Sequence, residues 1–184
     1  MSSRYYCESC GKWHDELPRS WGAATPLPLE WIPPPERSAR CDWNDDVCVI
    51  DGQQFFIRGC LEIPVLEGHG PLIWGVWVSL SEKSFQRVLE LWETPGRETE
   101  PSFFGWMCTV LPLYPDTLSL KTQVHLRPVG SRPFVELEPT DHPLAVEQRE
   151  GITEARLREI ARALAPGRSP NSWRSWIQRW LKWR

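Results

Sequence analysis

The sequence predicts an α+β fold in which an antiparallel sheet and segregated helices form one domain. Three observations support this prediction: strand-like patterns cluster between residues 47 and 137, helix-like patterns stand apart from them, and 18 prolines divide the chain into short elements. With 184 residues, of which 41% are hydrophobic and 24% charged, the chain can bury an ordinary core. This composition excludes a wholly disordered chain, a coiled coil and a collagen.

Residues 1–46 are expected to form an irregular N-terminal lobe, because their prolines leave no room for a long helix. We expect four tryptophans to anchor this lobe on the main body: Trp13, Trp21, Trp31 and Trp43.

A β-hairpin is predicted from Val47 to Arg58, because apolar runs flank Asp51-Gly52 and this dipeptide supplies the positive φ angles of a tight hairpin turn. The second strand continues to Ile63, with Gly59 interpreted as a bulge. Residues 72–80 form a long apolar run that predicts a third, central strand.

A helix is predicted to follow this strand, because Ser79 and Glu82 have capping-box spacing and apolar residues then recur at helical spacing. Its apolar face consists of Phe85, Val88, Leu89 and Trp92. Residues 103–110 predict another strand.

Residues 118–127 alternate strictly between apolar and polar side chains, which predicts a half-buried strand, and residues 134–138 are its expected partner. Pro143 to Glu150 fits a short helix or a turn. Thr153 can cap a last helix, whose apolar face consists of Leu157, Ile160, Ala161 and Leu164. Residues 1–166 are therefore expected to form the domain.

Cys7-Glu8-Ser9-Cys10-Gly11 is the main candidate for chemistry, because two thiolates at this spacing can bind one Zn²⁺ from a tight turn. A tetrahedral site needs two more ligands, and the candidates are His14, Cys41, Cys48 and Cys60. We predict a structural zinc site formed by Cys7, Cys10, His14 and Cys48, since a strand starting at Val47 could lie beside the N-terminal turn.

Three alternatives to structural zinc stay open. The cysteines could all be reduced thiols in the core or on the surface. A redox pair is disfavoured, because no βαβ unit surrounds Cys7. Catalytic zinc, with water as fourth ligand, is disfavoured because no deaminase or protease motif places a Glu nearby.

The segment Glu138-Pro139-Thr140-Asp141-His142-Pro143, with Glu147 close behind, is a second candidate. Asp141 and His142 could perform acid–base catalysis. The same residues also suit a rigid turn between two prolines, which is the favoured interpretation. Arg58, Glu62 and Lys121 are explained by pairing or by a solvated sheet face.

The C-terminal segment 167–184 carries five basic residues and no acidic one, so subtracting it from the net charge of −3 leaves −8 on residues 1–166. An acidic body does not fit a protein that binds duplex nucleic acid, and single-stranded nucleic acid is a weak case. Helical spacing puts Trp173, Trp176 and Trp180 on one face. We expect this amphipathic helix to dock on its own domain, ahead of a protein partner, a second copy or a membrane surface.

Several strings of the sequence resemble a bacterial family catalogued as domain of unknown function 2199, over about residues 6–164. They include the segment Cys7 to His14 and the segments Phe55–Gly59, Trp74–Ser81, Leu111–Lys121 and Leu137–Ile152. The resemblance implies a single bacterial domain and no particular activity.

Taken together, the sequence favours a non-enzymatic binding or regulatory module with structural zinc. The alternative is a hydrolase-like enzyme that uses the turn at Asp141 and His142, with or without a metal. A cytoplasmic location is expected, because no apolar leader or membrane span is visible.

Overall fold

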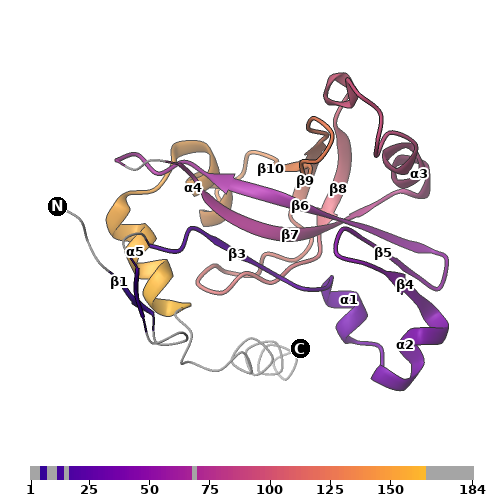
Figure 1. Ribbon diagram of the computed structural model, residues 1–184, viewed down its shortest axis with the longest axis horizontal. Helices are drawn as coiled ribbons and strands as arrows, with labels where there is room; N and C mark the ends of the chain where they lie inside the picture. The colour runs from indigo at the N-terminus through magenta and orange to yellow at the C-terminus, as the bar shows by residue number, and fades with distance from the viewer. Residues whose placement is uncertain (1–4, 8–11, 15–16, 68–69, 165–184) are drawn as a thin grey trace.

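The computed structural model describes residues 17–67 and 70–164 together with the backbones of two short strands, β1 (Tyr5–Cys7) and β2 (Lys12–His14). These two strands pair antiparallel as a separate hairpin, with Cys7 opposite Lys12. The other strands form one sheet of eight, and Figure 1 shows how the helices lie around it. The expected C-terminal helix 167–184 lies outside the described residues, so its docking stays a prediction.

Five strands close into a barrel, and their bounds are β6 (Gln54–Ile63), β7 (Leu72–Leu80), β8 (Phe103–Met107), β9 (Lys121–His125) and β10 (Phe134–Leu137). Each pairs antiparallel with the next, and β10 then pairs with β6. The closing pair is parallel, because in a meander of five strands the first and the last run in the same direction.

The expectation of an antiparallel sheet is therefore correct only in part. Beside the closing pair, β3 (Ser20–Gly22) runs parallel to β7 at the edge of the sheet. On the other side, β5 (Val47–Ile50) and β4 (Cys41–Trp43) extend β6 by antiparallel pairing. The α+β class is confirmed, but the sheet is mixed.

The interior of the barrel is the main core, and helices extend this core at both ends of the long strands (Figure 1). Helix α3 (Glu82–Glu90) lies at one end and contributes Phe85 and Val88. Helices α4 (Pro143–Glu150) and α5 (Glu154–Ala163) lie at the other end and contribute Leu144 and Leu157. The buried Trp74 lies in this core.

A second, smaller core lies on the outer face of the barrel, where the N-terminal lobe covers it. The sequence predicts an irregular lobe, but the lobe contains two short helices, α1 (Leu27–Glu30) and α2 (Pro34–Arg40), and its described residues form no long helix, as the prolines predict. Leu29 and Ile32 pack with Cys48 and Trp77, whose indole Nε1 donates to the carbonyl of Ala23 at 3.2 Å. The lobe therefore covers part of the barrel and leaves other parts of it open.

Local sequence signals account well for the elements themselves. Asp51 and Gly52 have φ angles of 52° and 63°, so the predicted hairpin turn is confirmed. Thr153 caps α5 through a hydrogen bond to the Arg156 amide. The cap of α3 is Ser81 rather than Ser79, because Ser79 is still part of β7.

The interpretation of Gly59 as a bulge is wrong, because β6 and β7 pair without interruption from Phe55 to Ile63. Gly59 instead lies where β10 approaches most closely. A Cβ atom there would be 2.5 Å from Val135 Cγ2 and 2.9 Å from the carbonyl oxygen of Pro133. The glycine is needed for the barrel to close.

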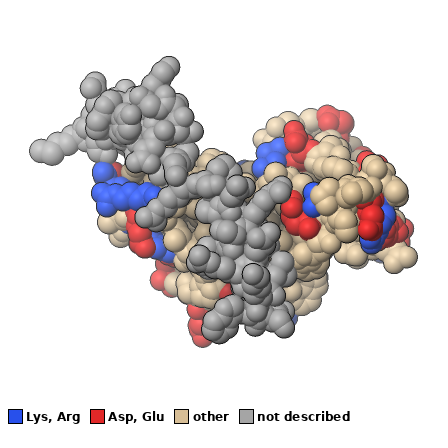
Figure 2. All heavy atoms as spheres, turned by 90° about the horizontal axis from the view of Figure 1, so that it is seen from below, with Lys and Arg blue, Asp and Glu red and all other residues tan. Residues whose placement is uncertain are grey.

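Charges of both signs lie side by side on the face that Figure 2 shows. Among the ion pairs of the described residues, Arg40 binds both Asp51 and Glu36. In the parts of the chain that the structure describes, no helix is both long and apolar enough for a membrane span.

Candidate functional site

A cleft opens where β6 and β10 separate beyond their single paired position, Phe134 opposite Cys60. There the side chain of Gln148, from α4, makes the hydrogen bonds to β10 that a neighbouring strand would otherwise make. Its Oε1 accepts from the Leu137 amide and its Nε2 donates to the Val135 carbonyl, both at 2.8 Å. The edge of β10 is thus satisfied without β6, and the two strands can diverge.

This cleft has a volume of about 480 Å³, which is within the usual range for small-molecule sites. Most of the side chains that line it are apolar, with a few polar groups among them. The apolar ones are Pro64, Val65, Pro71, Phe134, Leu137 and Pro139, and the polar ones are Glu62, Glu136, Gln148 and Arg149.

Both carboxylates of the cleft already have cationic or imidazole partners. Glu62 Oε1 accepts from Arg127 Nη2 at 2.7 Å, and Glu136 Oε2 lies 2.8 Å from His125 Nε2. The Arg127 guanidinium also lies over the Phe134 ring, 5.3 Å from its centroid. Arg127 and His125 therefore hold the two carboxylates in place. Carboxylates that are already paired suit the recognition of a ligand better than acid–base catalysis.

Cys60 lies between Arg58 and Glu62 on the outer face of β6. Burial raises the pKa of its thiol, and the cations of Arg127, Arg132 and Arg58 counteract this only in part. A thiol with a raised pKa is protonated at neutral pH and is a poor nucleophile. Cys60 is therefore not a catalytic candidate.

The turn at Asp141 and His142 serves as the start of α4. His142 Nδ1 accepts from the Leu144 amide at 3.2 Å, which makes His142 the N-cap, while Asp141 is exposed. Nε2 of His142 is buried without a hydrogen-bond partner among the described residues. This geometry matches the interpretation as a rigid turn, and the catalytic role of Asp141 and His142 stays a prediction.

Glu147, which lies near that turn in the sequence, belongs to a partly buried network with Tyr114 and Arg156. Tyr114 Oη donates to Glu147 Oε2, and Arg156 Nε donates to Glu147 Oε1 at 2.9 Å. Burial, and then the Glu147 carboxylate, raise the pKa of Tyr114 well above its usual value. The network joins α4 and α5 to the loop that precedes β9, so we assign it a structural role.

Of the predicted zinc ligands, only Cys48 is described with its side chain. It is buried in β5 beside Ile32 and Trp77, and burial raises its pKa to about 12. Figure 1 draws β5 and β1 at opposite ends of the molecule. This placement favours a core role for Cys48, and its part in a metal site stays a prediction.

Cys7 and His14 lie in the strands β1 and β2, but their side chains, and the whole of Cys10, lie outside the described residues. Among the residues that are described, no group of three or more His, Cys, Asp or Glu side chains could hold a metal ion. The other proposed alternatives, Cys41 and Cys60, are free thiols.

The comparison with protein families gives a match over residues 6–152 of the 184. The matching family is described as an uncharacterized protein conserved in bacteria, DUF2199. The chain belongs to this family. Neither the curated proteins nor the solved structures contain a match. The DUF2199 match covers the barrel and α4, so the cleft lies within the region that defines the family.

The residues around the cleft gave little signal in the sequence. In the sequence, Glu62 is only a charged residue in a strand, Gln148 is only part of the string Leu137–Ile152 that resembles the family, and Arg127 only ends an alternating strand. They meet only because the barrel closes, and a pattern along one strand contains no information about that closure.

Proposed function

We propose that this chain is a non-enzymatic binding module whose ligand occupies the cleft between β6, β10 and α4. The observation that carries the proposal is the cleft itself, which has about 480 Å³ of space, an apolar lining, and two carboxylates that are already paired. Binding sites for small molecules commonly combine an apolar surface with a few fixed polar groups.

The groups that could perform catalysis are engaged elsewhere, which supports binding over the hydrolase alternative. His142 uses Nδ1 to cap α4, and Glu147 holds Tyr114 and Arg156. Neither residue lines the cleft. The chemistry of the lining suits a ligand with an apolar body and hydrogen-bonding groups that can reach Gln148 or the exposed Arg149.

The test is a ligand-observed NMR screen of amino acids, short peptides, nucleotides and sugars. Pro139 is exposed at the cleft, so Pro139→Trp fills part of it, and Pro101→Trp adds the same side chain at an exposed position elsewhere. We expect a compound that binds the wild type and Pro101→Trp but not Pro139→Trp, and that is recovered unchanged after incubation. Turnover of the bound compound would support the enzyme instead, and equal binding by both variants would rule out the cleft.

We also propose that the N-terminal hairpin supplies three of the four ligands of a structural zinc site, namely Cys7, Cys10 and His14. The antiparallel pairing of β1 with β2 supports this, because it brings together the two strands that carry Cys7 and His14. Two cysteines separated by two residues, with a histidine close behind, have the spacing of ligands in structural zinc sites.

The metal prediction is tested on protein purified without added metal or an affinity tag. We expect about one zinc ion per chain, and we expect its removal by a chelator to abolish amide-exchange protection in residues 5–14, because structural metal binding is coupled to folding. Cys7→Ser should lose the zinc, whereas Cys60→Ser, a half-buried thiol in the barrel, should retain it. Wild-type protein without metal would refute the site.

A further inference from the structure

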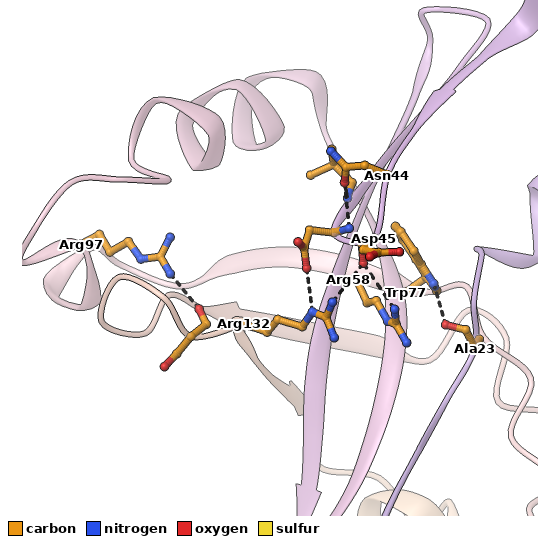
Figure 3. Close-up of polar contacts among 10 residues, drawn as sticks. Ala23, Asn44, Asp45, Arg58, Trp77, Arg97 and Arg132 are labelled. Carbon is orange, nitrogen blue, oxygen red and sulfur yellow. Dashed lines mark hydrogen bonds and ion pairs between the residues drawn. The ribbon is translucent and has the colours of Figure 1, made fainter.

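Two arginine side chains lie next to each other on the outer face of the barrel, as Figure 3 shows. Arg58 belongs to β6, and Arg132 belongs to the loop between β9 and β10. The backbone carbonyl of Asp45 accepts from Arg58 Nη1 and from Arg132 Nη2, at 3.4 Å in each case. The two cations therefore share one neutral acceptor. Because both are positively charged and close enough to bind the same carbonyl oxygen, they repel each other.

Arg58 lies in a slot that two glycines create. A Cβ atom on Gly22 would be 3.1 Å from Arg58 Nη2, and one on Gly75 would be 3.5 Å from the same atom. One side of the guanidinium thus packs against the backbone of β3 and β7, and its Nε is buried there. Burial, and then the charge of Arg132, lower the pKa of Arg58, and the charges of Asp45 and Asp46 counteract this only in part.

Most of the hydrogen-bonding capacity of Arg58 is unused. A guanidinium has five N–H donors, and in the described part of the chain Arg58 has one long bond, to the Asp45 carbonyl. Its Nε is buried and has no acceptor there. Arg132 differs, because its Nε binds Asp46 Oδ1 at 2.6 Å. Arg58 is therefore a partly desolvated cation without a carboxylate in direct contact, which is unfavourable unless something else binds it.

Both loops beside this pair are held rigidly. Asn44 Oδ1 accepts from the amides of Asp46 and Val47, which fixes the turn that presents the Asp45 carbonyl. Arg97 Nη2 donates to the Ser131 carbonyl at 2.7 Å, directly before Arg132 in the chain (Figure 3). The two guanidinium groups are thus positioned before any ligand arrives, and such preorganisation favours tight recognition.

We propose that Arg58 and Arg132 form a binding site for an oxyanion, either a carboxylate or a phosphate group. Guanidinium groups match both oxyanions in shape and charge, and an anion at this point would take the free donors of Arg58 and reduce the repulsion between the two cations. The site is separate from the cleft, since Arg58 precedes Glu62 by four residues, about 13 Å along an extended strand. It does not depend on the function proposed above.

The test is a titration of the full chain with inorganic phosphate, and separately with acetate, against chloride at constant ionic strength. The arginine Nε–H resonances are followed by NMR. We expect the resonances of Arg58 and Arg132 to shift saturably with at least one of the two anions. The anion that binds more tightly shows whether the site prefers a phosphate group or a carboxylate. Arg132→Gln should weaken the binding on the order of tenfold, the loss expected for a charge-assisted hydrogen bond. Arg40→Gln, an exposed arginine with two carboxylate partners, should not change it.

Thermal unfolding of Arg58→Met provides a second measurement. Because the variant removes an unpaired cation, we expect its midpoint in chloride to equal or exceed that of the wild type, and we expect stabilisation by phosphate or acetate to disappear. The proposal is overturned if neither anion gives a saturable shift. This result is expected, for example, if a carboxylate of the chain itself already binds the two arginines. It is also overturned if Arg132→Gln and Arg40→Gln bind the anion equally, or if Arg58→Met retains the stabilisation.

Discussion

Replacing Arg97 with glutamine is expected to lower the free energy of unfolding by about 3 kcal/mol, because it removes a buried cation that donates to four backbone carbonyl groups. Arg97 is only 3% exposed. Its guanidinium donates to the carbonyls of Trp92, Arg127, Pro128 and Ser131. The side chain therefore fixes the whole loop that carries Arg127 to the cleft and Arg132 to the proposed anion site.

Lysine should not rescue this position, because one ammonium group cannot reproduce the planar fork that reaches four acceptors. Arg87→Gln is the matched control, since Arg87 is exposed and pairs with Glu90 and Glu100, and its loss should be much less costly. Urea unfolding of the three variants measures the differences. A cost below about 1 kcal/mol for Arg97→Gln would contradict the role assigned to this residue.

Gly59→Ala is expected to destabilise the protein by about 3 kcal/mol, because the new methyl group overlaps atoms that cannot easily move. The Cβ atom would be 2.5 Å from Val135 Cγ2 and 2.9 Å from the Pro133 carbonyl oxygen. The clash falls next to the described pairing of β6 with β10, Phe134 opposite Cys60, so relief requires the two strands to move apart. We therefore also expect faster amide exchange in residues 134–137.

Gly52→Ala is the control for the loss of a glycine as such. Gly52 has a φ of 63° and no atom within 4 Å of a Cβ, so the cost there comes only from the left-handed backbone, about 1 kcal/mol. Chemical denaturation combined with hydrogen exchange separates the two effects. Equal losses at both positions, with no change in exchange along β10, would mean that close packing at Gly59 does not hold the barrel closed.

The elements of the fold could be predicted from the sequence because their signals are local. The positive φ angles at Asp51 and Gly52 and the cap at Thr153 each depend on neighbours within a few residues. The parallel pairs of β3 with β7 and β10 with β6 join distant segments, and no local pattern indicates them. The number of strands in the closed meander decides the direction of the closing pair, and this number is a property of the whole fold.

The candidate site was harder to predict for the same reason. The Gln148 side chain makes two hydrogen bonds to the backbone of β10, where a neighbouring strand would otherwise pair. A glutamine on a short helix gives no sign of this in the sequence. Arg58 and Arg132 come together only across the sheet. The turn at Asp141 and His142 attracted attention by its residue types, yet its described bonds are those of a helix cap.

The most direct test of the central claim is to map where a compound identified in the NMR screen binds. Backbone amide shifts would be followed during a titration of the wild-type chain. We predict that the largest shifts occur at Glu62, Phe134, Leu137 and Gln148, which line the cleft. Shifts centred on the exposed aromatic pair Phe104 and Trp106 of β8 instead, with the cleft unchanged, would contradict the claim that the cleft is the binding site.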